Sequence, residues 1–315
     1  MKNIGITKVM YRTSEDFTTN FGLKIRRFIN PVFRRLLRLG TKRKIVIEKY
    51  PDLIKGKPYI FACSHSFDED IISNLYAIDR SAYSLCGTSE QILHNPKMYA
   101  NWINGMIFVN RRDSQSRKDS ILKMKKVIEG GSSIHMYPEG GWNNTENLLI
   151  QPLFAGPYTL YNETQTLIVP LATFHEYGTK TIYIRAWKPL SFDKMSKDKA
   201  LGILRDAMAT MIWEMIESHS TPIKRKTLRN QDFRLNYMEE RKNEYLRVPW
   251  TKDVWDDELT VYKDKNHPLP DEVWSFVDNV EITAKNAHIF APLLVLREEH
   301  KKYDFKQYMH DNWDK

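Results

Sequence analysis

Short apolar runs rich in β-branched and aromatic residues alternate with longer segments of helical period between residues 44 and 219. Apolar runs of four to eight residues predict buried strands, whereas apolar residues that recur every three or four positions predict helices. This alternation is typical of a sheet covered by helices, because parallel strands need crossover connections between them. We therefore predict an α/β fold with a mixed, mostly parallel central sheet flanked by helices.

The predicted elements follow from these runs. Strands are expected at 44–48, 59–63, 83–86, 106–110, 133–137, 167–172 and 181–187, and helices at 90–103, 116–129, 154–163 and 197–219. The last helix has a Leu and Met stripe, which predicts core packing. In sheets of this kind ligands bind at the carboxyl ends of the strands, so residues that follow strands are the first candidates for function.

The 315 residues divide into three parts by composition and hydrophobic pattern. We predict an N-terminal amphipathic basic helical segment at 1–43, a main α/β domain at 44–220 and a C-terminal extension at 221–315. The extension is polar and charged, with scattered Trp and Pro, and its pattern predicts no function.

The basic character of the chain is concentrated near its start. The net charge is +9, and the segment 24–44 holds nine basic residues and no acidic one. Its apolar residues recur at helical spacing, which predicts one apolar face with most arginines off it. Asn30-Pro31 predicts a helix restart, with Asn as the cap and Pro in the first turn. Residues 23–39 suit either packing on the domain or an anionic membrane surface, and a docked helix can do both.

Targeting signals and cysteines indicate the compartment. No apolar run approaches the roughly 18–20 residues that cross a bilayer, and residues 1–20 have no apolar region of the kind found in signal peptides. The two cysteines, Cys63 and Cys86, cannot form a disulfide framework. We expect a cytoplasmic protein that associates peripherally with the inner face of the cell membrane. We expect no metal and no cofactor.

The first candidate site follows the strand at 59–63. Four residues separate His65 from Asp70. If the chain turns into a helix after His65, the Asp70 carboxylate can fix the imidazole tautomer, so that the other ring nitrogen accepts a proton from a hydroxyl group. An ordinary surface His near an acidic helix start gives the same pattern.

Two further candidate sites also follow strands. Arg111 and Arg112 come directly after the strand at 106–110, and a guanidinium fork suits phosphate. Successive residues of a strand point to opposite faces, so one of the two is expected to reach the site. Glu139, Gly140, Gly141 and Trp142 follow the strand at 133–137, where glycines let the backbone approach a ligand. Gly-Gly is also typical of a plain turn.

Four blocks taken together resemble the glycerolipid acyltransferase family, which includes the lysophosphatidic acid acyltransferases. Its His-x4-Asp matches His65 and Asp70, and its Gly-x-Ile-Phe-Val-x-Arg matches Gly105 through Arg111. Its Phe-Pro-Glu-Gly matches Tyr137 through Gly140 in three positions, with Tyr in place of Phe. Its Ile-Val-Pro-Val matches Ile168-Val169-Pro170-Leu171 in three positions. The resemblance covers about half of the chain, roughly residues 44–190, and implies that the domain predicted at 44–220 is an acyltransferase domain.

The resemblance implies an O-acyltransferase that uses an acyl carrier protein or coenzyme A thioester as co-substrate. His65, held by Asp70, would be the catalytic base. Arg111 would bind the acceptor phosphate, and Glu139, Gly140 and the neighbouring backbone would position the acceptor. A thiol nucleophile at Cys63 is the alternative to direct transfer.

One departure from the family bears on the acceptor. The family has Thr-Arg-Ser after Glu-Gly, whereas this chain has Gly141-Trp142-Asn143 and so lacks an arginine there. Either Arg111, Arg112 or another cation replaces it, or the acceptor is not lysophosphatidic acid. Trp stacks on sugar rings, so a glycolipid or a surface polysaccharide is the alternative acceptor.

The alternative of another class is a basic, non-enzymatic protein that binds nucleic acid or a membrane. No zinc spacing and no basic motif interleaved with aromatic residues occurs in the sequence. We therefore expect no nucleic-acid partner.

Overall fold

The chain divides into two compact units, Met1–Val248 and Pro249–Lys315. The computed structural model describes residues 19–67, 69–87, 105–110, 113–141, 143, 149–176 and 179–221, all of which belong to the first unit. The helix predicted at 90–103 and all of the predicted extension but Thr221 lie outside these residues. The predicted domain boundaries therefore stay predictions.

Seven strands form one sheet in the described part of the chain. They are β1 (Lys44–Lys49), β2 (Ile60–Cys63), β3 (Ala82–Gly87), β4 (Met106–Val109), β5 (Ser133–Met136), β6 (Ile168–His175) and β7 (Thr181–Ala186). Their order across the sheet is β1-β7-β6-β2-β5-β3-β4. Only β6 and β7 pair antiparallel; the other neighbours are parallel. The predicted mixed, mostly parallel sheet is confirmed.

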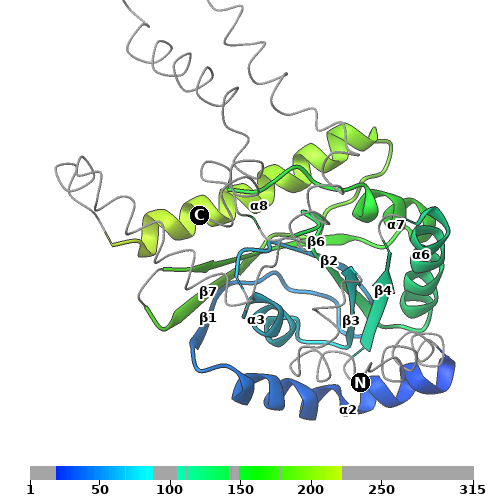
Figure 1. Ribbon diagram of the computed structural model, residues 1–315, viewed down its shortest axis with the longest axis horizontal. Helices are drawn as coiled ribbons and strands as arrows, with labels where there is room; N and C mark the ends of the chain where they lie inside the picture. The colour runs from blue at the N-terminus through cyan, green and yellow to red at the C-terminus, as the bar shows by residue number, and fades with distance from the viewer. Residues whose placement is uncertain are drawn as a thin grey trace, which may run out of the picture. The chain divides into compact units, whose positions relative to one another are not determined.

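Five helices accompany the sheet in the same residues: α2 (Asn20–Gly40), α3 (Asp70–Ala77), α6 (Ser114–Glu129), α7 (Gly156–Thr164) and α8 (Lys197–His219). Figure 1 shows α6, α7 and α8 against one face of the sheet, and α3 against the other with α2 outside it. Strand β2 is buried on both faces: Ile60 and Ala62 join the core under α6, α7 and α8, while Phe61 and Cys63 join the core on the α3 side. A strand buried on both faces is a continuous apolar run, which is why the sequence predicts it well.

The N-terminal helix differs from its prediction. Helix α2 begins at Asn20, where the Thr19 hydroxyl caps it by accepting from the Gly22 amide (3.2 Å), and it continues through Pro31. The predicted restart at Asn30-Pro31 is wrong. An interior Pro costs about 3 kcal/mol, and α2 tolerates it because both halves are anchored: Leu23 and Leu37 are buried, one on each side of Pro31.

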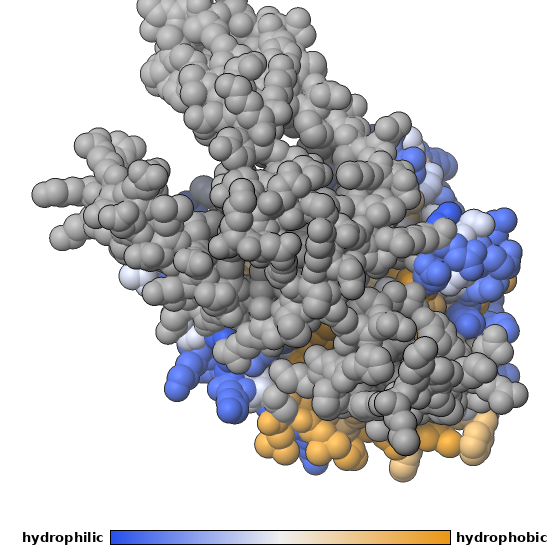
Figure 2. Space-filling model, in the orientation of Figure 1, coloured by the Kyte–Doolittle hydropathy of each residue, from blue (hydrophilic) through white to orange (hydrophobic). Residues whose placement is uncertain are grey.

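The face of α2 that packs on the domain mixes apolar and basic side chains, whereas most of the large apolar side chains of this helix are exposed. Leu23, Arg26 and Leu37 are buried, and Arg34 donates to the Tyr76 carbonyl (Nη2, 2.7 Å) and pairs with Asp79. The large apolar side chains point outward: Phe21, Ile25, Phe28, Ile29, Val32, Leu36 and Leu39. Figure 2 shows apolar surface gathered on the side where α2 lies. Among the described helices, none is both long and apolar enough to span a bilayer.

Candidate active site

A buried carboxylate orients an imidazole where β2 gives way to α3. The Nδ1 atom of His65 lies 2.9 Å from Oδ2 of Asp70. The Asp70 side chain is fully buried, whereas that of His65 is 14% exposed, so the ring reaches the surface while its partner does not. The same Asp70 oxygen accepts from the backbone amides of Ser66 (2.8 Å) and Phe67 (3.3 Å). The structure therefore brings together the two predicted catalytic residues, with the connecting turn wrapped around the carboxylate.

Tyr137, the first residue after β5, completes this pair. Its ring stacks on the imidazole of His65, with centroids 3.9 Å apart and planes 14° from parallel. Its hydroxyl donates to Oδ1 of Asp70 (3.1 Å). In the sequence, Tyr137 stands out only as part of a motif. The signal for its hydroxyl is that the family has Phe at this position, so the hydroxyl is a departure of this chain from the motif.

Glu139 holds the turn rather than facing outward. Its carboxylate is fully buried; Oε1 accepts from the His65 amide (3.0 Å) and Oε2 from the Gln151 amide (2.9 Å). Burial raises the pKa of Glu139 to about 8, although these amides, which favour the charged form, oppose that shift. This geometry gives Glu139 a role in fixing the backbone of His65, and contact with an acceptor stays a prediction.

Gly140 makes the tight turn after Glu139 possible. Its φ is +77°, and a Cβ atom there would lie 2.3 Å from the Phe154 ring. Gly140 donates its amide hydrogen to the Tyr137 carbonyl (3.1 Å) and the Phe154 amide donates to the Pro138 carbonyl (2.7 Å). The Phe154 ring thus occupies the space next to Gly140, and the predicted approach of this backbone to a ligand stays a prediction. Gly141 follows in the same turn.

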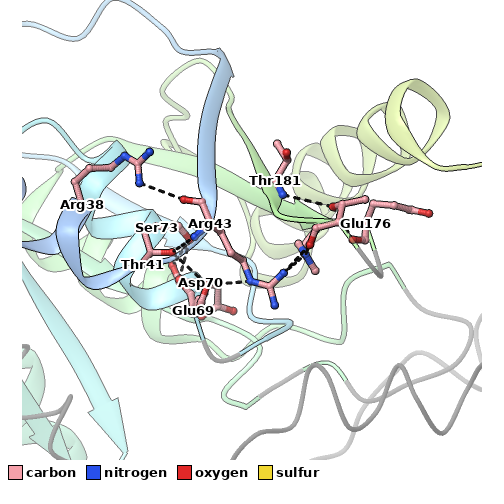
Figure 3. Close-up of polar contacts among 10 residues, drawn as sticks. Arg38, Thr41, Arg43, Glu69, Asp70, Ser73, Glu176 and Thr181 are labelled. Carbon is pink, nitrogen blue, oxygen red and sulfur yellow. Dashed lines mark hydrogen bonds and ion pairs between the residues drawn. The ribbon is translucent and has the colours of Figure 1, made fainter.

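A buried ion pair fixes the residue before Asp70. The Nε atom of Arg43 lies 3.0 Å from Oε2 of Glu69, and Thr41 donates its hydroxyl to the same oxygen (3.2 Å). Figure 3 shows this cluster beside Asp70, with Ser73 at the start of α3. The Ser73 hydroxyl contacts the carbonyls of Glu69 and Asp70 (both 3.0 Å). The cluster ties the segment before β1 to the first turn of α3, and so supports the position of Asp70.

Three predicted site residues lie outside the described part of the chain: Arg111, Arg112 and Trp142. Strand β4, which precedes the arginines, is separated from β2 by β5 and β3. Three strand spacings correspond to about 14 Å at the sheet. Contact of Arg111 with a ligand at His65 therefore requires the loop after β4 and the long Arg side chain to reach toward β2, and it stays a prediction.

Two other ionisable groups lie near the pair and are buried. Burial lowers the pKa of His135 to about 3, with a smaller contribution from His65, so His135 is neutral near pH 7. Burial also raises the pKa of the Cys63 thiol well above its ordinary value, and Asp70 adds to this shift. A thiolate at Cys63 is therefore disfavoured. Within the described ranges, no three His, Cys, Asp or Glu side chains are grouped so as to hold a metal ion.

A family of known proteins matches the segment that contains this site. Residues 44–173 match the family model described as Acyltransferase. This segment is an acyltransferase domain. The match confirms the family that the four motifs indicate, and it includes His65, Asp70, Tyr137, Glu139 and Gly140.

One solved structure similar to this chain is the crystal structure of the 1-acyl-sn-glycerophosphate (LPA) acyltransferase PlsC from Thermotoga maritima. The two chains are 13% identical with a TM-score of 0.50, and the match covers 70% of this chain and 98% of the other. At this identity the likeness shows a shared fold. No curated protein matches the chain.

Proposed function

We propose that this acyltransferase moves a fatty acyl chain from an acyl thioester to a hydroxyl group of a lysophospholipid such as lysophosphatidic acid. The observation that carries the proposal is the contact between His65 Nδ1 and Asp70 Oδ2, set in an acyltransferase domain. A buried carboxylate on Nδ1 leaves Nε2 as the nitrogen that accepts a proton. His65 is the general base and Asp70 the residue that orients it.

The proposed reaction is a direct transfer. The acceptor hydroxyl oxygen attacks the thioester carbonyl carbon while its proton passes to Nε2 of His65. The imidazolium that forms is stabilised by the buried charge of Asp70. The C–S bond then breaks, and the proton moves from His65 to the departing sulfur. The buried Cys63 thiol takes no part, because its raised pKa disfavours the thiolate.

The acceptor is bound next to His65 by residues that follow β4 and β5. In this proposal Arg111, with Arg112 as its neighbour, binds the acceptor phosphate through a guanidinium fork. The turn that contains Glu139, Gly140 and Gly141 shapes the floor of the site next to His65. The donor is an acyl carrier protein or coenzyme A thioester, and the basic excess of the chain suits either of these acidic molecules.

A sequence departure favours a second acceptor class. Trp142 stands where the family has an arginine, and an indole ring stacks on sugars. A glycolipid or surface-polysaccharide hydroxyl would be acylated by the same base. The two acceptor classes differ in whether a phosphate is needed next to the hydroxyl.

Helix α2 would bring the enzyme to its substrates at the inner face of the cell membrane. Phe28 is 86% exposed and Leu39 is 81% exposed, and they belong to the outward apolar face of this helix. Lys24, Arg27 and Arg35 are also exposed on α2. An apolar face bordered by cations is how a helix lies in the headgroup region of an anionic leaflet.

The test is a transfer assay with purified protein. Radiolabelled acyl-CoA and acyl-ACP are each incubated with lysophosphatidic acid, other lysophospholipids, a glycolipid and a crude lipid extract, and products are identified by mass spectrometry. We expect an acylated lysophospholipid with the wild type and none with H65A. Acylation of glycolipids alone would support the second acceptor class. No acyl transfer to any acceptor, or full activity in H65A, would overturn the proposal.

A further inference from the structure

We propose that Tyr137 is a positioning residue for the His65–Asp70 pair, and that Asn74 and Thr173 hold its hydroxyl in the donating orientation. This inference rests on the proposed function, since it assigns a role in the same site. It concerns a hydroxyl group that the motif resemblance does not account for, because the family has Phe where this chain has Tyr137.

The directions of the hydrogen bonds are fixed by the chemistry of the groups. The Asp70 carboxylate can only accept, so the Tyr137 hydroxyl donates to its Oδ1 atom (3.1 Å). The Tyr137 oxygen in turn accepts from Nδ2 of Asn74 (3.2 Å). The Asn74 amide must therefore present its oxygen on the other side, where the Thr173 hydroxyl donates to it (2.5 Å). The hydrogen bonds therefore all point in one direction: Thr173 donates to Asn74, Asn74 to Tyr137, and Tyr137 to the carboxylate.

The two donors behind the Tyr137 hydroxyl are buried and come from separate elements. Asn74 is fully buried in α3 and Thr173 is buried in β6. Thr173 is itself held, because its amide donates to the Ser64 hydroxyl (2.9 Å), one residue before His65. Buried polar networks in which every member is satisfied restrict the orientation of each side chain. The hydroxyl of Tyr137 is thus fixed from two elements other than its own.

The ring of Tyr137 constrains His65 in a second, independent way. One face of the phenol stacks on the imidazole of His65 at 3.9 Å. The ring of His135 lies against it edge to face, with centroids 4.8 Å apart and planes 81° from parallel. A phenol wedged between two imidazoles cannot rotate freely, so it limits rotation of the His65 ring about its side-chain bonds.

The hydroxyl has an electrostatic effect as well as a geometric one. A donated hydrogen bond stabilises the charged form of a carboxylate and makes it less basic. Removal of this hydroxyl would therefore leave Asp70 with a stronger attraction for the imidazolium of His65. Burial and Asp70 raise the pKa of Tyr137, so its hydroxyl remains a donor across the range of an assay.

The other ionisable groups around the pair are accounted for. They are Cys63 on β2, His135 on β5, Glu139 in the turn after β5, Arg205 on α8, which acts on Glu139, and the Arg43–Glu69 ion pair at the start of α3. Of these, Glu139 has a pKa of about 8 and titrates within an ordinary assay range. The variants below leave all of these groups in place, so their titration is common to every sample.

The test compares Y137F, which keeps the stacked ring and removes the hydroxyl, with Y137L, which removes both. We expect kcat to fall about tenfold in Y137F, as for loss of one hydrogen bond to a charged group, and further in Y137L, with KM little changed in either. The acidic limb of the pH dependence of kcat/KM should move to higher pH in Y137F by about half a unit. The matched control is Y161F, which removes another tyrosine hydroxyl bond, that between Tyr161 and Ser191 (2.6 Å), away from the pair.

A measurement without turnover separates this inference from the proposed function. The pKa of His65 is followed by NMR of ring-labelled histidine in the full chain, with H65N used to assign the signal. We expect it to rise in Y137F and to be unchanged in Y161F. That result with no acyl transfer in any sample would support the positioning role and reject the proposed function.

The support from β6 is tested by T173V, which removes the donor to Asn74, and T173S, which keeps it. We expect T173V to shift the His65 pKa in the direction of Y137F, and T173S to restore the wild-type value. An unchanged His65 pKa in Y137F, with wild-type kcat, would overturn the proposal. So would a loss of activity in Y137F with wild-type His65 pKa and pH dependence, because a purely structural role predicts that pattern.

Discussion

The carbonyl oxygen of His65 accepts a hydrogen bond from the backbone amide of Asn143 (2.7 Å). On its other side, the amide of His65 donates to the buried carboxylate of Glu139 (3.0 Å). Both backbone polar groups of His65 are therefore bonded to the segment that follows β5. The position of the imidazole is set by main chain as well as by Asp70, so changes to Asp70 alter its chemistry more than its place.

Replacement of Asp70 tests that separation. In D70N the amide oxygen can still accept from Ser66 and His65, but the negative charge that stabilises the imidazolium is lost. We expect kcat to fall by about 10²–10⁴-fold with little change in KM. Circular dichroism and the melting temperature should stay close to wild type. Wild-type turnover in D70N would contradict a base that depends on this carboxylate.

Replacement of Cys63 distinguishes direct transfer from a thioester intermediate on the enzyme. Cys63 is fully buried in β2 and its thiol is held neutral by burial. We expect C63A to keep wild-type kcat within about a factor of two, and to lose about 1 kcal/mol of unfolding free energy, as for removal of one buried group. Mass spectrometry of the wild type mixed with acyl-CoA should show no acylated protein. An acyl adduct that is absent from C63A would refute direct transfer.

Substitution of Gly140 tests the close packing of the turn. In G140A the φ of +77° becomes strained and the new methyl group meets the Phe154 ring. We expect a loss of about 2 kcal/mol or more of unfolding free energy in urea titrations. The double variant G140A/F154A relieves the clash but not the strain, so it should lose less than the two single changes added together. Additive losses would show that the contact with Phe154 does not limit this position.

The outward face of α2 is tested with vesicles. F28D and L36D place charges on two exposed apolar positions without touching the buried anchor Leu23. We expect co-sedimentation of the double variant with phosphatidylglycerol-containing vesicles to fall about tenfold or more, because each side chain contributes about 1.5–3 kcal/mol when buried in lipid. The control is L122D, an equally apolar and exposed position on α6. Equal losses in the control and the double variant would refute a specific role of α2.

The raised pKa of Glu139 predicts a pH dependence of stability. Its pKa is about 8 in the folded protein against an ordinary value of 4.5, so between these values the folded state binds the extra proton. The contribution of Glu139 to the free energy of unfolding is therefore complete below about pH 4.5 and falls as pH rises to about 8. The slope is at most about 1.4 kcal/mol per pH unit.

The measurement is urea unfolding of the wild type and E139Q at half-unit steps from pH 5 to pH 9. We expect the stability difference between them to move in favour of E139Q as pH rises to about 8, and then to level off. E163Q, at an exposed carboxylate on α7 paired with Lys125, is the control and should show a constant difference. A constant difference for E139Q as well would mean that Glu139 is ionised throughout.

Most of the sheet could be predicted from the sequence because its strands are buried. All seven strands lie near their expected positions. The buried strand β2 leaves a continuous apolar run, whereas the partly exposed edge strand β1 is indicated by its β-branched residues. Helix α6 begins two residues earlier than expected because the Asp113 side chain caps it by accepting from the Gln115 amide (2.9 Å).

The orientation of α2 could not be predicted in the same way. Helical spacing states which side chains share a face, but not which face meets the domain. Arg26 and Arg34 lie on the packed side of α2 because Tyr83 and the carbonyl of Tyr76 are there to receive them, and both partners are distant in sequence.

In the site, sequence spacing was enough for His65 and Asp70, which are five positions apart. The contacts of Tyr137 depend on the register of β2 with β5, where Ala62 is opposite Met136, so the residues that follow both strands meet at one edge. The pairing of Arg43 with Glu69 likewise joins residues 26 positions apart. Tertiary contacts of this kind leave no periodic signal in a single sequence.

Helix α3 contacts the candidate active site at its first residue and helix α2 at its last turn. Its first residue, Asp70, faces the imidazole, and its last turn receives Arg34 of α2 at the carbonyl of Tyr76. Packed helices are about 8–10 Å apart, so only the thickness of α3 separates the exposed apolar helix α2 from the Asp70 carboxylate. If α2 lies on a bilayer, a lipid substrate in that bilayer would be only a short distance from the His65–Asp70 pair. Binding through α2 would then orient the active site relative to the membrane as well as hold the enzyme there.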